Sequence, residues 1–502
     1  MRRLRLLILR NVHNSFQGPI CIPNQLRWFE WPGAPSIPEF SSGPKKLVGL
    51  GMSKSSITTV AKQFKDFQQL KYIKLSYCES LVSMPDLSCT PNLEELDLGY
   101  CKKLVEVHES VAYHDKLQEL KLTGCSKLSV FPKVLKSKHL QALYLDGCKK
   151  FERFPDIPNE LEGLEELWLL GTAIKELLAS IENLVSLESL FLDNCNNLTS
   201  LPSSIYNLQN LESLGIRGCT NFTRFPKYED SLDPRMKTGL SSLGSLRLEG
   251  CSLSEVEFLE NLSCFPFLRQ LRLTGNNMTG LPTSLNKRAH LSHLIVENCR
   301  QLEEIPELPP SISYLSADGC ESLKNNGDLT SLHHFVRKGL AMADIYSTGR
   351  MPDGFIIILD GGDMPEWIFP IEGSISFMAS KDLYDKFLAL ALCFVLCNDE
   401  SEEIPLVVSH ANGKRLDHLI HYSYESNLDQ MSLEYLTPCE LWEEVEFSQI
   451  DGSYVRFSIS STAVKKWGFR ILCKPLEDDL KEVLQENKLI DPALLYEVCH
   501  ES

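Results

Sequence analysis

Leucines recur along the first two-thirds of the chain in a fixed phrase. The phrase is LxxLxL followed three residues later by Cys, and between the leucines stand mostly polar residues. Clear copies start at Leu93, Leu117, Leu140, Leu187 and Leu211. Looser copies start at Leu4, Leu26, Leu47, Leu70, Leu164, Leu243, Leu268, Leu291 and Ile312. From Leu47 to Leu211 successive copies are 23 or 24 residues apart, so the phrase is an internal repeat.

The spacing of this repeat predicts its fold. In the LxL part, alternate side chains point to opposite faces of a strand, so the leucines enter a shared core and the residues between them face solvent. One repeat cannot cover its own leucines, but stacked repeats bury them continuously. The period lies within the leucine-rich-repeat range. We therefore predict an α/β leucine-rich-repeat solenoid over residues 1–335, with about fourteen repeats and a parallel sheet on its concave face. The longer interval from Leu211 to Leu243 predicts a polar loop around Lys227–Gly239.

A different pattern follows the repeats. Alternating apolar residues through 355–473 predict antiparallel strands. A family resemblance, given below with its residues, implies that residues 336–475 form an all-β, jelly-roll-like sandwich. The longest apolar run, Phe387 to Cys397, has 11 residues. It is too short for the ~20 residues of a membrane-spanning helix, so we expect a buried strand and no membrane span.

The charge balance supports a boundary near residue 340. Residues 341–502 hold 12 basic and 29 acidic side chains, which gives 12 − 29 = −17, the net charge of the whole chain. The first 340 residues are therefore neutral. Residues 476–502 form an acidic C-terminal tail, and the acidic part is a poor surface for nucleic acid.

Cysteine occurs 17 times, and nine copies share one repeat position. Thr172 and Asn276 stand at that position in two other repeats. Thr and Asn cannot replace thiolate ligands, and the chain has no CxxC pair. We therefore expect a small buried side chain that bonds to the backbone after the strand, not a metal or redox site.

Catalytic and cofactor motifs are missing. The segment Gly49–Ser55 faintly resembles a phosphate loop, but Gly51 is separated from Lys54 and the segment falls on a repeat strand. No G-x-S-x-G elbow occurs either. We expect no catalytic residue, no cofactor and no metal, and hence no enzyme.

The candidate binding residues lie between the second and third leucines of each phrase, because this position faces solvent on the concave sheet. Tyr144, Trp168 and Phe191 occupy it in three successive repeats and are expected about 5 Å apart, strand to strand. Such a patch reaches the size that marks a binding site. Arg217, Arg247 and Arg272 add positive charge beyond it. The alternative is that a loop or the C-terminal domain covers the aromatic side chains.

Several longer phrases resemble a known family. Residues 26–32 (LRWFEWP) resemble its early "LRYLxWxxYP" repeat, and residues 47–55 (LVGLGMSKS) its "LVELxMxxS". Residues 84–96 resemble "PDLSxxPNLEEL", residues 105–110 "VEVHxS", and residues 364–368 (MPEWI) the "IPEWF" of the domain after the repeats. The family is that of plant intracellular nucleotide-binding leucine-rich-repeat immune receptors of the Toll/interleukin-receptor class.

The resemblance implies a role in defence. It implies that the repeats and the post-repeat domain recognise a protein, either a pathogen effector or a host partner, in the cytoplasm or the nucleus. The family's NAD-cleaving and nucleotide-binding domains have no counterpart here, since the chain begins at Met1 inside a repeat; we therefore expect the sensing half of a receptor. Two alternatives stay open: a truncated regulatory or decoy paralogue that binds the nucleotide-binding domain of a full-length receptor, and a leucine-rich-repeat adaptor in ubiquitination.

Overall fold

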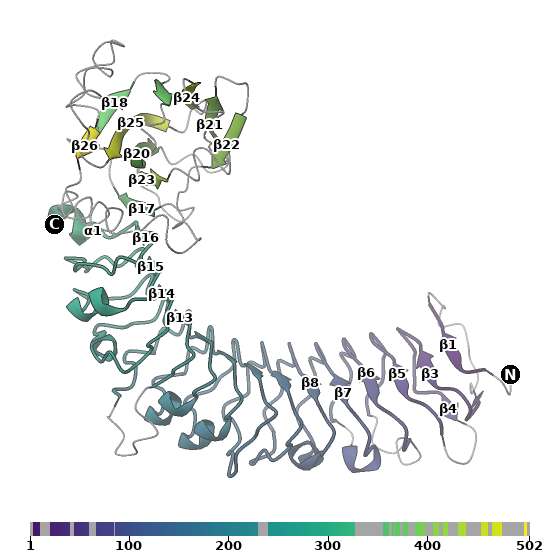
Figure 1. Cartoon of the computed structure of the whole chain (residues 1–502). Coiled ribbons are helices and arrows are strands. Elements are labelled where there is room, and N and C mark those ends of the chain that lie inside the picture. The colour runs from purple at the N-terminus through teal and green to yellow at the C-terminus, as the bar shows by residue number, and fades with distance from the viewer. Residues whose placement is uncertain are drawn as a thin grey trace. The chain divides into compact units, whose positions relative to one another are not determined.

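The structure is a computed structural model, and the chain forms two compact units, Met1–Leu268 and Arg269–Ser502 (Figure 1). In the repeat region it describes residues 4–10, 21–40, 45–59, 67–84, 86–228 and 239–326. Beyond them it describes residues 355–360, 364–365, 367–371, 375–379, 387–396, 405–410, 415–419, 430–437, 453–459, 464–473 and 496–498. Most of the expected polar loop, the expected boundary near residue 340 and most of the acidic tail lie outside these residues.

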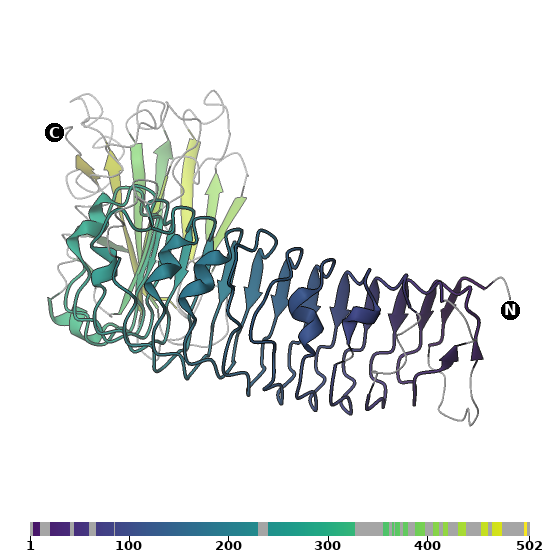
Figure 2. The same ribbon diagram turned by 90° about the horizontal axis from the view of Figure 1, so that it is seen from below.

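The first unit is built on a parallel sheet of short strands, one for each copy of the phrase. The strands are β1 (Leu6–Ile8), β3 (Trp28–Glu30), β5 (Gly49–Gly51), β6 (Tyr72–Lys74), β7 (Glu95–Asp97), β8 (Glu119–Lys121), β9 (Ala142–Tyr144), β10 (Glu166–Trp168), β11 (Ser189–Phe191), β12 (Ser213–Gly215) and β13 (Ser245–Arg247). Each pairs in parallel with the next, and equivalent phrase positions stand opposite one another. Figure 2 shows these strands side by side along the unit. A separate parallel pair, β2 (Cys21–Ile22) and β4 (Glu39–Phe40), lies near the start of the unit.

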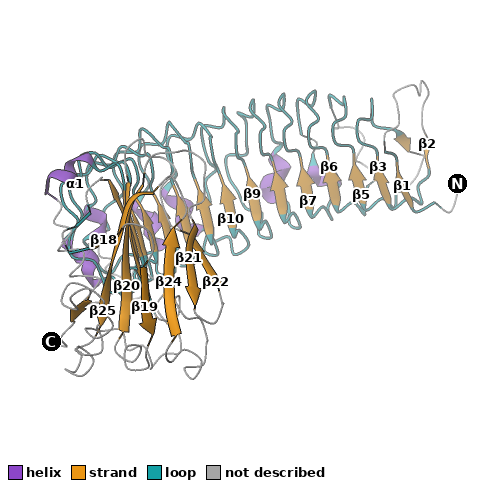
Figure 3. Cartoon of the chain, turned by 90° about the horizontal axis from the view of Figure 1, so that it is seen from above, coloured by secondary structure: helices purple, strands orange, loops and turns teal. Residues whose placement is uncertain are grey.

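The returns between strands contain little helix, which corrects the α part of the predicted α/β class. In the first unit they hold short 3-10 turns (Figure 3), which are η1 (Leu87–Cys89), η2 (Glu109–Tyr113), η3 (Ala179–Asn183), η4 (Ser203–Asn207) and η5 (Glu257–Leu259). Other returns are extended, with parallel bridges such as Ser83 to Glu106 and Glu106 to Val130. Pro202 and Pro282 are the N-cap residues of η4 and of η6 (Thr283–Lys287), so each of these short turns starts directly after a proline. The fold is a leucine-rich-repeat β-solenoid.

The core is a stack of leucines closed by a ladder of cysteines. The phrase leucines, such as Leu143 and Leu167, are completely buried. The nine repeat cysteines donate from Sγ to a backbone carbonyl of the preceding repeat, at 2.8–3.2 Å. Thr172 and Asn276 donate instead to the carbonyls of Leu169 and Leu273. The expected backbone-bonding role of this position is confirmed.

The second unit begins with three more repeat strands and continues into longer ones. The repeat strands are β14 (Gln270–Arg272), β15 (His293–Ile295) and β16 (Tyr314–Ala317), with η6 (Thr283–Lys287) and α1 (Glu321–Asn326) among the returns. β16 pairs in parallel with β17 (Phe355–Asp360), so the repeat sheet runs directly into the C-terminal strands.

The C-terminal strands form two sheets. β17 continues through β23 (Gln430–Leu436), β20 (Phe387–Leu396), β25 (Val464–Cys473) and β18 (Phe369–Ile371), all antiparallel, while β26 (Tyr496–Val498) is parallel to β25. The other sheet has the order β19 (Ile375–Ala379), β24 (Ser453–Ile459), β21 (Pro405–His410) and β22 (Arg415–Leu419). The expected buried strand in the apolar run is confirmed, since Ala389 to Leu396 are at most 3% exposed. The jelly-roll class of this region stays a prediction.

Candidate protein-recognition surface

Three aromatic rings lie together on the solvent-facing side of the sheet of the first unit. Trp168 lies opposite Tyr144 on one neighbouring strand and Phe191 on the other. The ring centroids of Tyr144 and Trp168 are 6.0 Å apart, and those of Trp168 and Phe191 are 4.8 Å apart. The predicted adjacency of these residues, the aromatic row, is confirmed. All three side chains are half-buried, so no described segment covers the row completely.

A glycine determines where the row ends. Gly215 occupies the next position on β12, and a Cβ atom added there would lie 2.9 Å from Cδ1 of Phe191. The Phe191 ring therefore occupies the space that a side chain at position 215 would need.

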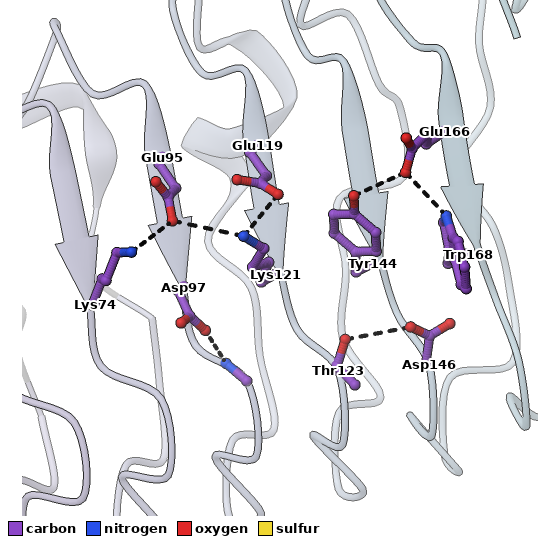
Figure 4. A network of polar contacts seen from close by, with 11 residues as sticks. Lys74, Glu95, Asp97, Glu119, Lys121, Thr123, Tyr144, Asp146, Glu166 and Trp168 are labelled. Atoms are coloured by element: carbon purple, nitrogen blue, oxygen red, sulfur yellow. Dashed lines mark hydrogen bonds and ion pairs between the residues drawn. The ribbon is translucent and has the colours of Figure 1, made fainter. Parts of the chain in front are cut away.

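A carboxylate holds two of the rings in place. Tyr144 Oη and Trp168 Nε1 both donate to Oε2 of Glu166, at 2.9 and 3.2 Å (Figure 4). Burial, together with the hydrogen bond to Glu166, raises the pKa of Tyr144, so its hydroxyl remains a donor. Among the residues that the structure describes, none donates a hydrogen bond to the other oxygen, Oε1.

Ion pairs occupy the equivalent positions on β6 to β8. Lys121 Nζ lies 2.8 Å from Glu119 Oε1 and 3.7 Å from Glu95 Oε1, and Lys74 Nζ lies 3.5 Å from the same Glu95 oxygen (Figure 4). Burial disfavours the charged form of Lys121, but the hydrogen bond and charge of Glu119 outweigh it and raise the pKa of Lys121. The lysine also lies over the Tyr144 ring, 6.0 Å from its centroid.

The predicted arginines do not extend the row. Arg217 lies beyond the end of β12 and is exposed, and its backbone N–H bonds to Asp193 Oδ1 at 2.8 Å. Arg247 is half-buried on β13, two strands after Phe191. Arg272 lies on β14, in the second unit.

A hollow beside the row was missed by sequence reasoning. It measures about 260 Å³ and lies where Ala142, between Glu119 and Glu166 on neighbouring strands, leaves room. Its lining residues are Tyr72, Glu94, Glu95, Gln118, Glu119, Gln141, Ala142, Glu165 and Glu166. The sequence carries a signal for the hollow, because glutamates recur between the first and second leucines of the phrase.

Comparisons with known proteins show what the repeat region resembles. A family model described as "Disease resistance protein RPS4B-like, leucine-rich repeats" matches residues 137–342. Residues 137–342 are therefore similar to the leucine-rich repeats of these plant disease resistance proteins. The curated relatives are resistance proteins as well, and the chain matches part of their length.

Individual disease resistance proteins cover different shares of the chain. TMV resistance protein N of Nicotiana glutinosa is 29% identical over 384 residues, which is 67% of this chain and 33% of that protein. Disease resistance protein RPV1 of Vitis rotundifolia is 41% identical over 90 residues, 17% of this chain and 6% of that protein. The chain thus spans about a third or less of the length of these relatives. In disease resistance proteins the leucine-rich repeats are the non-catalytic region.

Solved structures of similar proteins are also repeat proteins. A leucine-rich-repeat protein of Leptospira interrogans is 22% identical and covers 66% of this chain and 94% of its own, with a TM-score of 0.37. Within the described part of the chain, no group of three or more His, Cys, Asp or Glu side chains could hold a metal ion. No helix in those residues is long and apolar enough to cross a membrane.

Proposed function

We propose that this chain is the protein-recognition part of a plant immune receptor and that the aromatic row is the centre of its contact surface. The partner is a pathogen effector or a host protein, met in the cytoplasm or the nucleus. The post-repeat domain adds to the same recognition. The disease resistance relatives support a role in plant immunity, and the aromatic row supports the position of the contact surface.

The observation that carries the proposal is the aromatic row, in which the Trp168 ring packs against Tyr144 on one side and Phe191 on the other. A sheet backbone holds these side chains, so little conformational entropy is lost when a partner binds them. Aromatic residues at the centre of an interface commonly contribute most of its binding energy. Folding of the solenoid does not require the aromatic row, because the leucines below it already form the core.

Two neighbouring substitutions test the proposal. Trp168→Ala should weaken partner binding by ~2 kcal/mol or more, about thirtyfold, while the melting temperature changes little. Leu167→Ala, one residue earlier and completely buried, should instead lower stability by ~2–5 kcal/mol through the cavity it leaves.

Binding is measured by affinity purification from plant extract with quantitative mass spectrometry. Lys74→Ala is the matched control, because Lys74 occupies the same phrase position on β6 and is exposed. Proteins retained by the wild type and by Lys74→Ala but lost by Trp168→Ala are the expected partners. The proposal fails if Trp168→Ala retains the same proteins as the wild type, or if it melts as early as Leu167→Ala.

A further inference from the structure

The carboxylates around the aromatic row fall into two groups, compensated and uncompensated. Of the five glutamates that line the hollow, Glu94 pairs with Lys71, and Glu95 and Glu119 pair with Lys121. Glu165 and Glu166 form no ion pair with any residue that the structure describes. Glu166 stands opposite Ala142 in the sheet and accepts a hydrogen bond from Trp168.

Glu166 is also the better oriented of the two. Its Oε2 atom accepts from both Tyr144 and Trp168, which fixes the plane of the carboxylate, while Oε1 remains available. A carboxylate held by two donors loses little entropy when it binds a further donor. The exposed Glu165 and Glu188 add negative charge on the same side of the row, and Asp193 adds it beyond the other end of β11.

We propose that the partner places an arginine in this hollow. This inference rests on the proposed function and adds the chemistry of the partner. The guanidinium binds Oε1 of Glu166 above Ala142, and the apolar residues next to that arginine pack on Tyr144, Trp168 and Phe191. Arginine fits better than lysine, because its planar fork suits a carboxylate and its face suits an aromatic ring. Among the carboxylates that line the hollow, those of Glu165 and Glu166 attract the arginine of the partner, because those of Glu95 and Glu119 already pair with lysines of β6 and β8.

Glu166→Gln separates this role from a purely structural one. The amide keeps an oxygen that can accept from Tyr144 and Trp168, so the rings stay in place, but the negative charge is lost. If Glu166 only positioned the rings, the substitution would leave binding unchanged.

The probe is a display library of randomised short peptides, selected on the full chain and counter-selected on Trp168→Ala. The selected peptides should share an arginine flanked by apolar residues. The strongest one is then synthesised with arginine, with lysine and with citrulline, which has the shape of arginine without its charge. The arginine peptide should bind the wild type about tenfold more tightly than the citrulline peptide, and Glu166→Gln should abolish that preference.

Filling the hollow gives a second measurement. Ala142→Lys places a cation of the chain itself between Glu119 and Glu166, so it should leave folding intact and weaken the arginine peptide by about tenfold or more. Ser213→Lys is the matched control, because Ser213 holds the same phrase position on β12, about 14 Å away and beyond the screening length at physiological salt. It should change binding less than threefold, roughly the limit of measurement.

The outcomes separate this inference from the proposed function. Selected peptides that are apolar but lack arginine, or that bind Glu166→Gln as tightly as the wild type, overturn the arginine site and leave the aromatic row as a recognition surface. If the lysine peptide binds as tightly as the arginine peptide, the choice of arginine is overturned. A selection that yields no peptide dependent on Trp168 counts against both.

Discussion

Strands β6 to β8 and strands β9 to β11 belong to one sheet and present the same phrase positions to solvent, yet their surfaces differ in kind. On β7 and β8 the carboxylates of Glu95 and Glu119 are neutralised by Lys74 and Lys121. On β9 to β11 aromatic rings take the place of the lysines, and the carboxylate of Glu166 forms no ion pair with any residue that the structure describes. The first region satisfies its own charges, whereas the second leaves apolar area and negative charge for a partner. A repeat backbone can therefore hold different chemistry without any change of fold.

The core beneath the two regions should be equally sensitive to a cavity. Leu120 and Leu167 occupy the same phrase position below β8 and β10, and both are completely buried. Leu120→Ala and Leu167→Ala should each lower the free energy of unfolding by ~2–5 kcal/mol, measured by urea denaturation. A much smaller loss for Leu120→Ala would mean that the two regions differ below the surface as well.

The repeat could be predicted from sequence because its pattern carries its own register. Each of the fourteen phrases corresponds to a strand, eleven in the first unit and three in the second, 11 + 3 = 14. The burial of the residue three positions after the last leucine, such as Cys148 or Thr172, could be predicted from the same pattern. The predicted helical component was wrong, because nothing in the leucine spacing distinguishes a helix from an extended return.

The surface could be predicted only in part. Position in the phrase places Tyr144, Trp168 and Phe191 side by side, since strands of a parallel sheet align equivalent residues. It does not show that Glu166 binds two of them, because that depends on side-chain rotamers. The order of the C-terminal strands was also beyond the sequence, since the parallel pairing of β16 with β17 joins segments that no repeat relates.

Gly215 offers a sharper test of how the row is held. In Gly215→Ala the new Cβ would lie 2.9 Å from the Phe191 ring and 3.0 Å from Asp193 Oδ1, so the ring must move. Overpacking of this kind costs ~1–3 kcal/mol, against a gain of ~0.5–1 kcal/mol from removing a flexible glycine. We expect a net loss of about 1 kcal/mol in urea denaturation. Gly280→Ala is the control, because a Cβ there meets nothing within 4 Å; equal stability of the two variants would contradict the packing of Phe191.

The hydrogen bond of Tyr144 gives a prediction with a pH dependence. Tyr144→Phe should cost about 1 kcal/mol at neutral pH, because Glu166 loses one donor. The pKa of Tyr144 is raised in the folded state, from its ordinary value of 10.0, so its contribution is complete below that value and is lost as pH rises towards the folded pKa. The stability difference between the wild type and Tyr144→Phe should therefore hold up to about pH 10 and shrink above it.

The control for this experiment is Tyr113→Phe, because Tyr113 is 54% exposed on η2. This substitution should change the free energy of unfolding by less than ~0.5 kcal/mol. A difference for Tyr144→Phe that does not decrease above pH 10 would mean that Glu166 does not accept from the tyrosine hydroxyl.

The smallest effect separates the two regions by the sign of its salt dependence. Glu95→Gln removes a carboxylate that two lysines share at 3.5 and 3.7 Å, and these side chains are partly exposed, so the loss should be below ~1 kcal/mol. Added salt screens the pairs in the wild type, and the loss should therefore fall towards zero at about 1 M salt.

Glu166→Gln should behave in the opposite way. It weakens the two hydrogen bonds from Tyr144 and Trp168, which salt hardly affects, but at low salt it also relieves repulsion from the nearby Glu165 and Glu188. Its cost should thus grow as salt screens that repulsion. Urea denaturation of both variants at about 0.05 M and about 1 M salt measures the two slopes, and slopes of the same sign would show that the charge of Glu166 is compensated after all.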